Sequence, residues 1–327
     1  MAVKPSAITG AGTENNPYVI HNYDELKWCC EDADAVPEEQ AKTDYVYVKL
    51  NNDIDCSTYG MSFRWFVTCE HAVDIHLNSK AIENFYIQSS QYMFVVPSTA
   101  RNLSVHDGKI LNVYGDWIYQ SISVLHAENG GYPINFKNVS MSIDVSNFSN
   151  QVLIDSSTGI ALTMTNCTID LKGSSINKMT AMYLGYGCKY YTCDFHLDIT
   201  TDQRVLYIFY GGASSSAMGY ALNCRVMGRV QLNGFSATSY CVYNTVIRNC
   251  VFDVQVAPAT ASTVTSPFAY GMGQAVINYG IYNSDKLPNY LFTGTNYIAC
   301  TTADMDMRVN PNADVVLQEK GFDVIKG

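Results

Sequence analysis

The sequence has few charged residues and no concentration of positive charge. Charged residues make up 15% of the 327 positions, the formal net charge is −10, and the Lys and Arg residues are scattered singly. A surface that neutralises nucleic-acid phosphates needs clustered Lys and Arg, so nucleic-acid binding is not expected. No apolar run approaches the roughly 18 residues of a spanning helix, and the opening residues form no apolar segment. We therefore expect synthesis in the cytoplasm without membrane insertion.

Familiar catalytic and metal-binding motifs are also missing. The six His residues lack HExxH or any other ligand spacing, and no Ser lies in a G-x-S-x-G turn. The glycine pair at residues 211–212 lacks the Lys of a phosphate-binding loop. The eleven Cys are odd in number and include no CxxC pair. These absences predict no disulfide scaffold, no metal site and no cofactor.

What the sequence does contain is a repeat. Related segments, each a polar residue followed by an alternating strand pattern, recur at intervals of 28, 26, 31 and 26 residues; they start at Asn138, Asn166, Thr192, Asn223 and Asn249. A loosely kept period of this length is typical of a stacked solenoid.

Residues at equivalent places in the repeat are expected to stack from coil to coil. A Cys directly follows the polar residue in four units, at Cys167, Cys193, Cys224 and Cys250. Small apolar thiols at this place are predicted to be reduced and buried. Asn166 is predicted to turn the chain and to form an amide ladder with Asn of neighbouring coils.

The N-terminal part is predicted to cap the solenoid. Residues 10–20 form a glycine-rich turn and a short extended run, and Asn22 then stands three residues before Glu25 in a capping-box arrangement. An open solenoid end would expose its core and an unpaired strand edge, so residues 1–35 are assigned to an N-terminal cap with a short helix. Residues 36–300 are then the solenoid, and residues 301–327 a closing segment.

Two segments carry a family resemblance. The Pro-Tyr-Val-Ile run at residues 17–20, together with Leu-Asn-Asn-Asp-Ile-Asp at residues 50–55, resembles the N-terminal coils of right-handed parallel β-helix proteins from bacteriophage virions, such as tail spikes, tail fibres and head fibres. Residues 315–325 resemble the ending of such proteins. The resemblance implies an all-β, single-stranded right-handed parallel β-helix with a short N-terminal capping helix. It specifies a fold and a setting more than an activity.

Outward-facing acids are the first candidate site. Asp144, Asp170, Asp198 and Asp253 each stand between apolar neighbours at similar places in their strands, so they are predicted to form an outward ladder. A pair such as Asp170 and Asp198 could serve glycoside hydrolysis, for which retaining enzymes place two carboxyl groups about 5 to 5.5 Å apart. Any two outward residues on neighbouring coils are also about 5 Å apart, so solvated acids are the simpler interpretation.

Two further groups of polar residues have both a functional and a structural interpretation. The Asn/Asp cluster at residues 51–55 could bind calcium, but such clusters are also the usual chemistry of turns. His76, His106 and His196 alternate with apolar neighbours and are predicted to be outward polar positions in strands.

Tyr residues form the second candidate site. Tyr186, Tyr190, Tyr191 and Tyr210 lie in a short tyrosine-rich part of the chain. Tyr rings offer flat apolar area with a polar tip, which suits contact with a glycan or a protein partner. Packing inside the coil or in a subunit seam is the alternative.

The function expected from these features is a structural, non-enzymatic component on the surface of a bacteriophage particle, on the tail or the head, made in the host cytoplasm. The resemblance implies other virion proteins as partners, a homo-oligomer with the trimer favoured, and contact with host surface polysaccharide. The alternatives are a polysaccharide-depolymerising tail spike, acting as a glycoside hydrolase or lyase, and a bacterial surface adhesin.

Overall fold

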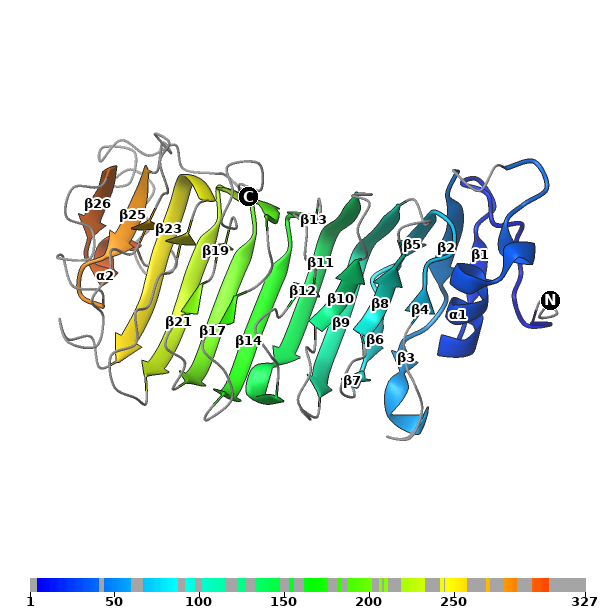
Figure 1. Cartoon of the computed structure of the whole chain (residues 1–327), viewed down its shortest axis with the longest axis horizontal. Coiled ribbons are helices and arrows are strands. Elements are labelled where there is room, and N and C mark those ends of the chain that lie inside the picture. The colour runs from blue at the N-terminus through cyan, green and yellow to red at the C-terminus, as the bar shows by residue number, and fades with distance from the viewer. Residues whose placement is uncertain are drawn as a thin grey trace.

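The fold was analysed in a computed structural model of the chain. The structure describes residues 5–40, 44–59, 67–87, 92–97, 102–115, 123–127, 133–147, 153–155, 162–175, 182–183, 187–201, 206–207, 209–210, 219–232, 242–243, 245–257, 269–270, 279–286 and 296–305. Strands run across a long axis and stack along it, with the helix α1 at the N-terminal end (Figure 1).

The first face of this stack is a parallel sheet that takes one strand from each coil. In order it contains β1 (Tyr18–Ile20), β2 (Val46–Leu50), β5 (Val73–His76), β9 (Leu103–Gly115), β11 (Ile134–Asp144), β13 (Leu162–Thr165), β16 (Lys189–Tyr191), β20 (Gly219–Leu222) and the first half of β23 (Thr245–Ala257). β25 (Tyr279–Asn283) pairs with β23 on both sides of the bend, and β26 (Asn296–Cys300) pairs with β25. Successive Cα partners Lys137, Thr165, Tyr191, Leu222 and Arg248 are 28, 26, 31 and 26 residues apart. These are the intervals of the sequence repeat, so the predicted parallel solenoid is confirmed.

Further parallel strands build the other faces. After a bend, the chain continues into β3 (Ile54–Asp55), β6 (Ala81–Glu83), the second halves of β9 and β11, β14 (Thr168–Ser175), β17 (Asp194–Thr201), β21 (Arg225–Leu232) and the second half of β23. A separate sheet contains β4 (Val67–Thr68), β8 (Tyr92–Val96), β10 (Ser123–Ala127) and β12 (Ile154–Asp155). The remaining pairings are β7 (Tyr86–Ile87) with β9, β15 (Met182–Tyr183) with β18 (Leu206–Tyr207), and β19 (Phe209–Tyr210) with β22 (Val242–Tyr243) and β24 (Ala269–Tyr270).

The bend between the first two faces requires a left-handed backbone. Its residues have φ angles of 53° to 59° and are Asp107, Asn138, Asn166, Thr192 and Asn223. Asn and Asp tolerate this conformation better than other residues with a Cβ, which explains the composition of the repeat. Asn166 Nδ2 donates to Asn138 Oδ1 at 2.8 Å, and Asn138 Nδ2 donates to Asp107 Oδ1 at 2.6 Å. The predicted turn and amide ladder at Asn166 are confirmed.

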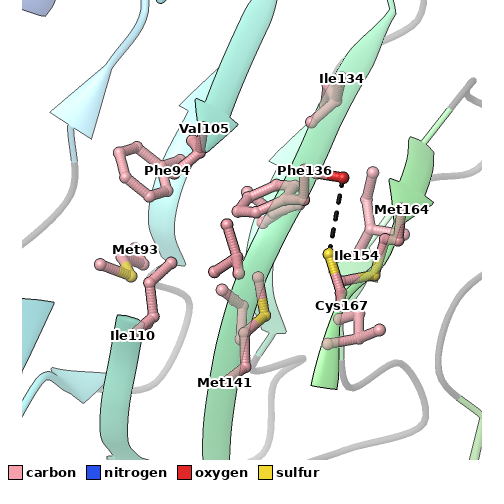
Figure 2. Packing of buried hydrophobic residues seen from close by; sticks show 14 of the residues in the cluster. Met93, Phe94, Val105, Ile110, Ile134, Phe136, Met141, Ile154, Met164 and Cys167 are labelled. Atoms are coloured by element: carbon pink, nitrogen blue, oxygen red, sulfur yellow. Dashed lines mark hydrogen bonds between the residues drawn. The ribbon is translucent and has the colours of Figure 1, made fainter. Parts of the chain in front are cut away.

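Apolar side chains fill the interior of the coils. Figure 2 shows Phe94, Phe136, Met141 and Met164 packed together with Cys167, whose thiol lies 3.6 Å from the Phe136 carbonyl oxygen.

The repeat thiols continue this pattern along the rod. The Sγ atoms of Cys193, Cys224 and Cys250 lie 3.3 to 3.6 Å from carbonyl oxygens of the preceding coil and donate to them. Every cysteine that the structure describes is a buried thiol, as predicted for the four repeat cysteines, while Cys241 lies outside the described residues.

The capping helix α1 (Tyr23–Glu31) begins where the capping box predicts. Asn22 Oδ1 accepts a hydrogen bond from the Glu25 N–H at 2.9 Å, and Glu25 Oε2 accepts one from the His21 N–H at 2.7 Å. The strand β1, inside the segment predicted as the cap, already pairs with β2. At the other end a short helix, α2 (Thr302–Met305), follows β26, and residues 306–327 of the predicted closing segment lie outside the described residues. None of the described helices is long and apolar enough to cross a membrane.

Candidate functional site

Two columns of outward side chains run side by side along the first face. Register places Tyr47, Asp74, Ser104 and Asn135 opposite one another on successive strands, and the second column contains Lys49, His76, His106, Lys137, Thr165 and Tyr191. The columns are two residues apart along each strand, so they share one face.

A cluster of two imidazoles and two carboxylates is formed by side chains of β5 and β9. His106 Nε2 is 2.8 Å from Asp74 Oδ1, and His106 Nδ1 is 2.7 Å from Asp107 Oδ2. The His76 ring stacks on the His106 ring with 4.7 Å between centroids and 13° between planes. His76 Nε2 lies 3.8 Å from Asp107 Oδ2. We call Asp74, His76, His106 and Asp107 the His–Asp cluster.

The cluster gives its two imidazoles different proton affinities. The hydrogen bond to Asp74 raises the pKa of His106, and the bond to Asp107 adds to the effect against the opposing effect of burial. Burial lowers the pKa of His76, and the neighbouring His106 lowers it further. Hydrogen bonds from Asn138 and then His106 lower the pKa of Asp107. The charged form is therefore favoured at His106 and the neutral form at His76.

The sequence predicted the exposure of these His residues but not their proximity. His76 and His106 are outward strand positions, as expected, and their rings are partly exposed. They are direct Cα partners although 30 residues apart. The shared pattern of Val-Asp-Ile-His at residues 73–76 and Leu-Ser-Val-His at residues 103–106 was the available signal, and it precedes the clearest repeats.

The acids of the predicted ladder are divided between two columns. Register places Asp170 opposite His196, whereas Asp198 stands opposite Lys172 and Arg229. His196 Nδ1 is 2.7 Å from Asp170 Oδ1. The prediction that these carboxylates face outward holds, but the single ladder was wrong, because their strands are offset by two residues. Asp170 and Asp198 are therefore not opposite each other on the neighbouring strands β14 and β17.

The Asn/Asp cluster at residues 51–55 makes the contacts of a turn, which was the alternative to a calcium site. Asp53 Oδ1 accepts from the Ala81 N–H at 2.8 Å, and Asp55 Oδ1 accepts from Asn84 Nδ2 and from the Ser57 N–H, both at 2.9 Å. These carboxylates stabilise the backbone of the turn and hold the Asn84 side chain.

The Tyr candidates do not form one surface. Tyr190 is 1% exposed, and its ring centroid lies 5.2 Å from that of Phe195 and 5.5 Å from that of Phe209. It therefore belongs to the core, as the packing alternative expects. Tyr191 is partly exposed in the column that contains His106, Tyr210 lies in β19 opposite Tyr243, and Tyr186 lies outside the described residues.

Comparison with known proteins supports the fold. No protein-family model matches the chain, and no curated protein sequence matches it. Among solved structures, the chain is similar to the crystal structure of a putative immunoglobulin A1 protease from Bacteroides ovatus, with a TM-score of 0.54 and 15% sequence identity over 93% of this chain and 91% of that chain. Similarity at this identity concerns the architecture alone, and it extends over nearly the whole solenoid.

Proposed function

We propose that this protein is a non-enzymatic rod on the surface of a bacteriophage particle, which presents its outer strand faces to other virion proteins and to host polysaccharide. One observation carries the proposal. Described acids on the outer face pair with cations or imidazoles on neighbouring coils, as Asp170 does with His196 at 2.7 Å and Asp194 with Arg225 at 3.8 Å.

This pairing argues against glycoside hydrolysis. The chemistry needs two carboxyl groups that flank one bond, and one of them must hold a proton near neutral pH. Register instead places Asp170 opposite His196, so the two candidate acids do not face each other. Lys172 and Arg229 stand on either side of Asp198, so the register favours a solvated, charge-balanced surface.

The virion setting is supported by the sequence resemblance at residues 17–20 and 50–55. The first of these segments includes β1, and the second includes the turn that leads to β3, both at the capped end of the solenoid. Reduced buried thiols suit a protein that folds in the host cytoplasm.

A homotrimer of rods side by side is the assembly that we propose. Light scattering coupled to size-exclusion chromatography should give three times the 36.2 kDa of one chain. A monomer at micromolar concentration would contradict the trimer without affecting the proposed virion location.

The location is tested on purified particles. Peptides of this protein should be found in virions purified on a density gradient, and antibodies should label the head or tail in electron micrographs. Portal, capsid or tail genes beside its gene would agree. New reducing ends or unsaturated sugars after incubation with capsular or wall polysaccharide would overturn the non-enzymatic assignment.

A further inference from the structure

We propose that His76, His106 and Asp107 bind a divalent transition-metal ion of the zinc class on the outside of the rod. This site is independent of the proposed virion location. Among the described residues, these three form the one group of His, Cys, Asp and Glu whose potential ligand atoms all lie within 4.8 Å of one another.

The spacing of the three ligand atoms is close to that of a tetrahedral site. Ligand atoms about 2.1 Å from zinc at tetrahedral angles are about 3.4 Å apart. The distances from Asp107 Oδ2 are 2.7 Å to His106 Nδ1 and 3.8 Å to His76 Nε2, one below and one above that value. The His76 ring is stacked on that of His106, so it must turn out of the stack for Nε2 to point at an ion shared with His106. The His76 side chain is 37% exposed and that of Asp107 42%, so both have room to turn.

Neighbouring groups already orient two of the ligands. Asp74 Oδ1 lies 2.8 Å from His106 Nε2 and can accept its N–H, so the ion would take the place of the Nδ1 proton that otherwise bonds to Asp107. A carboxylate that holds the far nitrogen of a metal-binding His is a recurrent arrangement, since it fixes the tautomer and the ring orientation. Asn138 Nδ2 donates to Asp107 Oδ1 at 2.6 Å, which leaves Oδ2 directed at both imidazoles.

The local charge also suits a divalent cation. Two carboxylates face two imidazoles, so once the ion displaces the His106 Nδ1 proton both rings are neutral and two negative charges remain for the ion to balance. Lys49 and Lys137 occupy the adjacent places in the same column, and their positive charge weakens cation affinity. Both lie at the surface, where long Lys side chains can extend into water.

The donor set determines the class of ion. Two imidazole nitrogens and one carboxylate oxygen favour Zn²⁺, Co²⁺, Ni²⁺ or Cu²⁺ over Mg²⁺ and Ca²⁺, which prefer all-oxygen sites. Three protein ligands leave a fourth position for water or another oxygen donor. The spacing of His along the chain predicted no metal site because the two imidazoles come from different coils.

The experiment titrates the full chain with Co²⁺ after removal of bound metal by a chelator and dialysis. We expect one Co²⁺ per chain with the visible bands of nitrogen and oxygen ligation, displaced by Zn²⁺. His76→Ala and Asp107→Asn should lose this binding, and Asp74→Asn should weaken it by about 10- to 100-fold because it acts through His106.

Two comparisons make the result specific. His196→Ala is the matched control, because His196 is also an outward imidazole in contact with a carboxylate, Asp170, and it should bind Co²⁺ like the wild type. Asp107→Asn retains the shape and the left-handed backbone of Asp107, so far-UV circular dichroism should be unchanged. The proposal is overturned if the wild type binds no Co²⁺, if binding survives in folded His76→Ala or is lost in His196→Ala, or if a thiolate charge-transfer band reveals Cys ligation.

Discussion

Replacing Thr192 by Asn is expected to stabilise the solenoid. Thr192 has a φ angle of 53° at the bend where neighbouring coils have Asn166 and Asn223. A β-branched residue is an outlier in the left-handed region, whereas Asn is tolerated there. An amide at this place could also donate to Asn166 and extend the ladder that joins Asn166 to Asn138.

The expected gain combines two terms. The left-handed conformation costs a residue with a Cβ about 1–2 kcal/mol, of which Asn recovers a part. One additional amide hydrogen bond contributes about 0.5–1.5 kcal/mol net. We therefore expect Thr192→Asn to raise the free energy of unfolding by about 1–2 kcal/mol, which corresponds to a factor of about 5–30 in the folded-to-unfolded ratio.

The assay should report on this bend, because coils of a solenoid can unfold separately. The Thr192 N–H donates to the Leu222 carbonyl at 2.9 Å, and the Asn166 N–H donates to the Tyr191 carbonyl at 2.9 Å. Hydrogen exchange of these amides should slow by the same factor, and the midpoint of urea unfolding should rise.

Two variants separate the contributions. Thr192→Gly relieves the strain without an amide, and its gain should be smaller because Gly is more flexible in the unfolded chain. Thr168→Asn makes the same chemical change two residues after the bend of the adjacent coil, in an extended strand position, where Thr is preferred and Asn should be neutral or destabilising. Faster exchange in Thr192→Asn, or equal stabilisation by Thr168→Asn, would refute the argument.

Three other outcomes are expected. Asn22→Ala should destabilise the cap by about 1 kcal/mol and Asn22→Asp should not, as measured by exchange of the α1 amides. Gly228→Ala should cost about 2–3 kcal/mol in urea unfolding, since φ is 106° and a Cβ would overlap the Leu197 carbonyl oxygen; an unchanged midpoint would contradict this. Burial raises the pKa of Cys188 to about 12, so roughly one thiol in ten thousand is ionised at pH 8. Its labelling by iodoacetamide should therefore remain slow in the native state, rise tenfold per pH unit below that pKa, and increase sharply on unfolding.

The stacked coils could be predicted from the sequence where successive bends carry the same type of polar residue. From Asn138 to Asn223, the left-handed bend selects Asn or a substitute, and each interval in the sequence equals an interval in the register. The first coils were harder to place because Asp107 differs from Asn138 in type.

Local alternation predicts whether a side chain faces outward, but it does not predict its neighbour on the next coil. That neighbour depends on loop length, and a two-residue offset places Lys172 rather than Asp170 opposite Asp198. The same dependence brings His76 against His106, a contact between residues 30 positions apart.

The direction of the inter-coil hydrogen bonds has a mechanical consequence. Strands cross the long axis, so the bonds between coils are directed along it (Figure 1). Tension applied to the two ends would peel the coils apart one after another, and the terminal pairing of β1 with β2, with three Cα partners, would yield early. A sideways load along the strands would instead be shared by many bonds at once. The rod is therefore built to withstand compression and shear, and it would be weak when pulled from its ends.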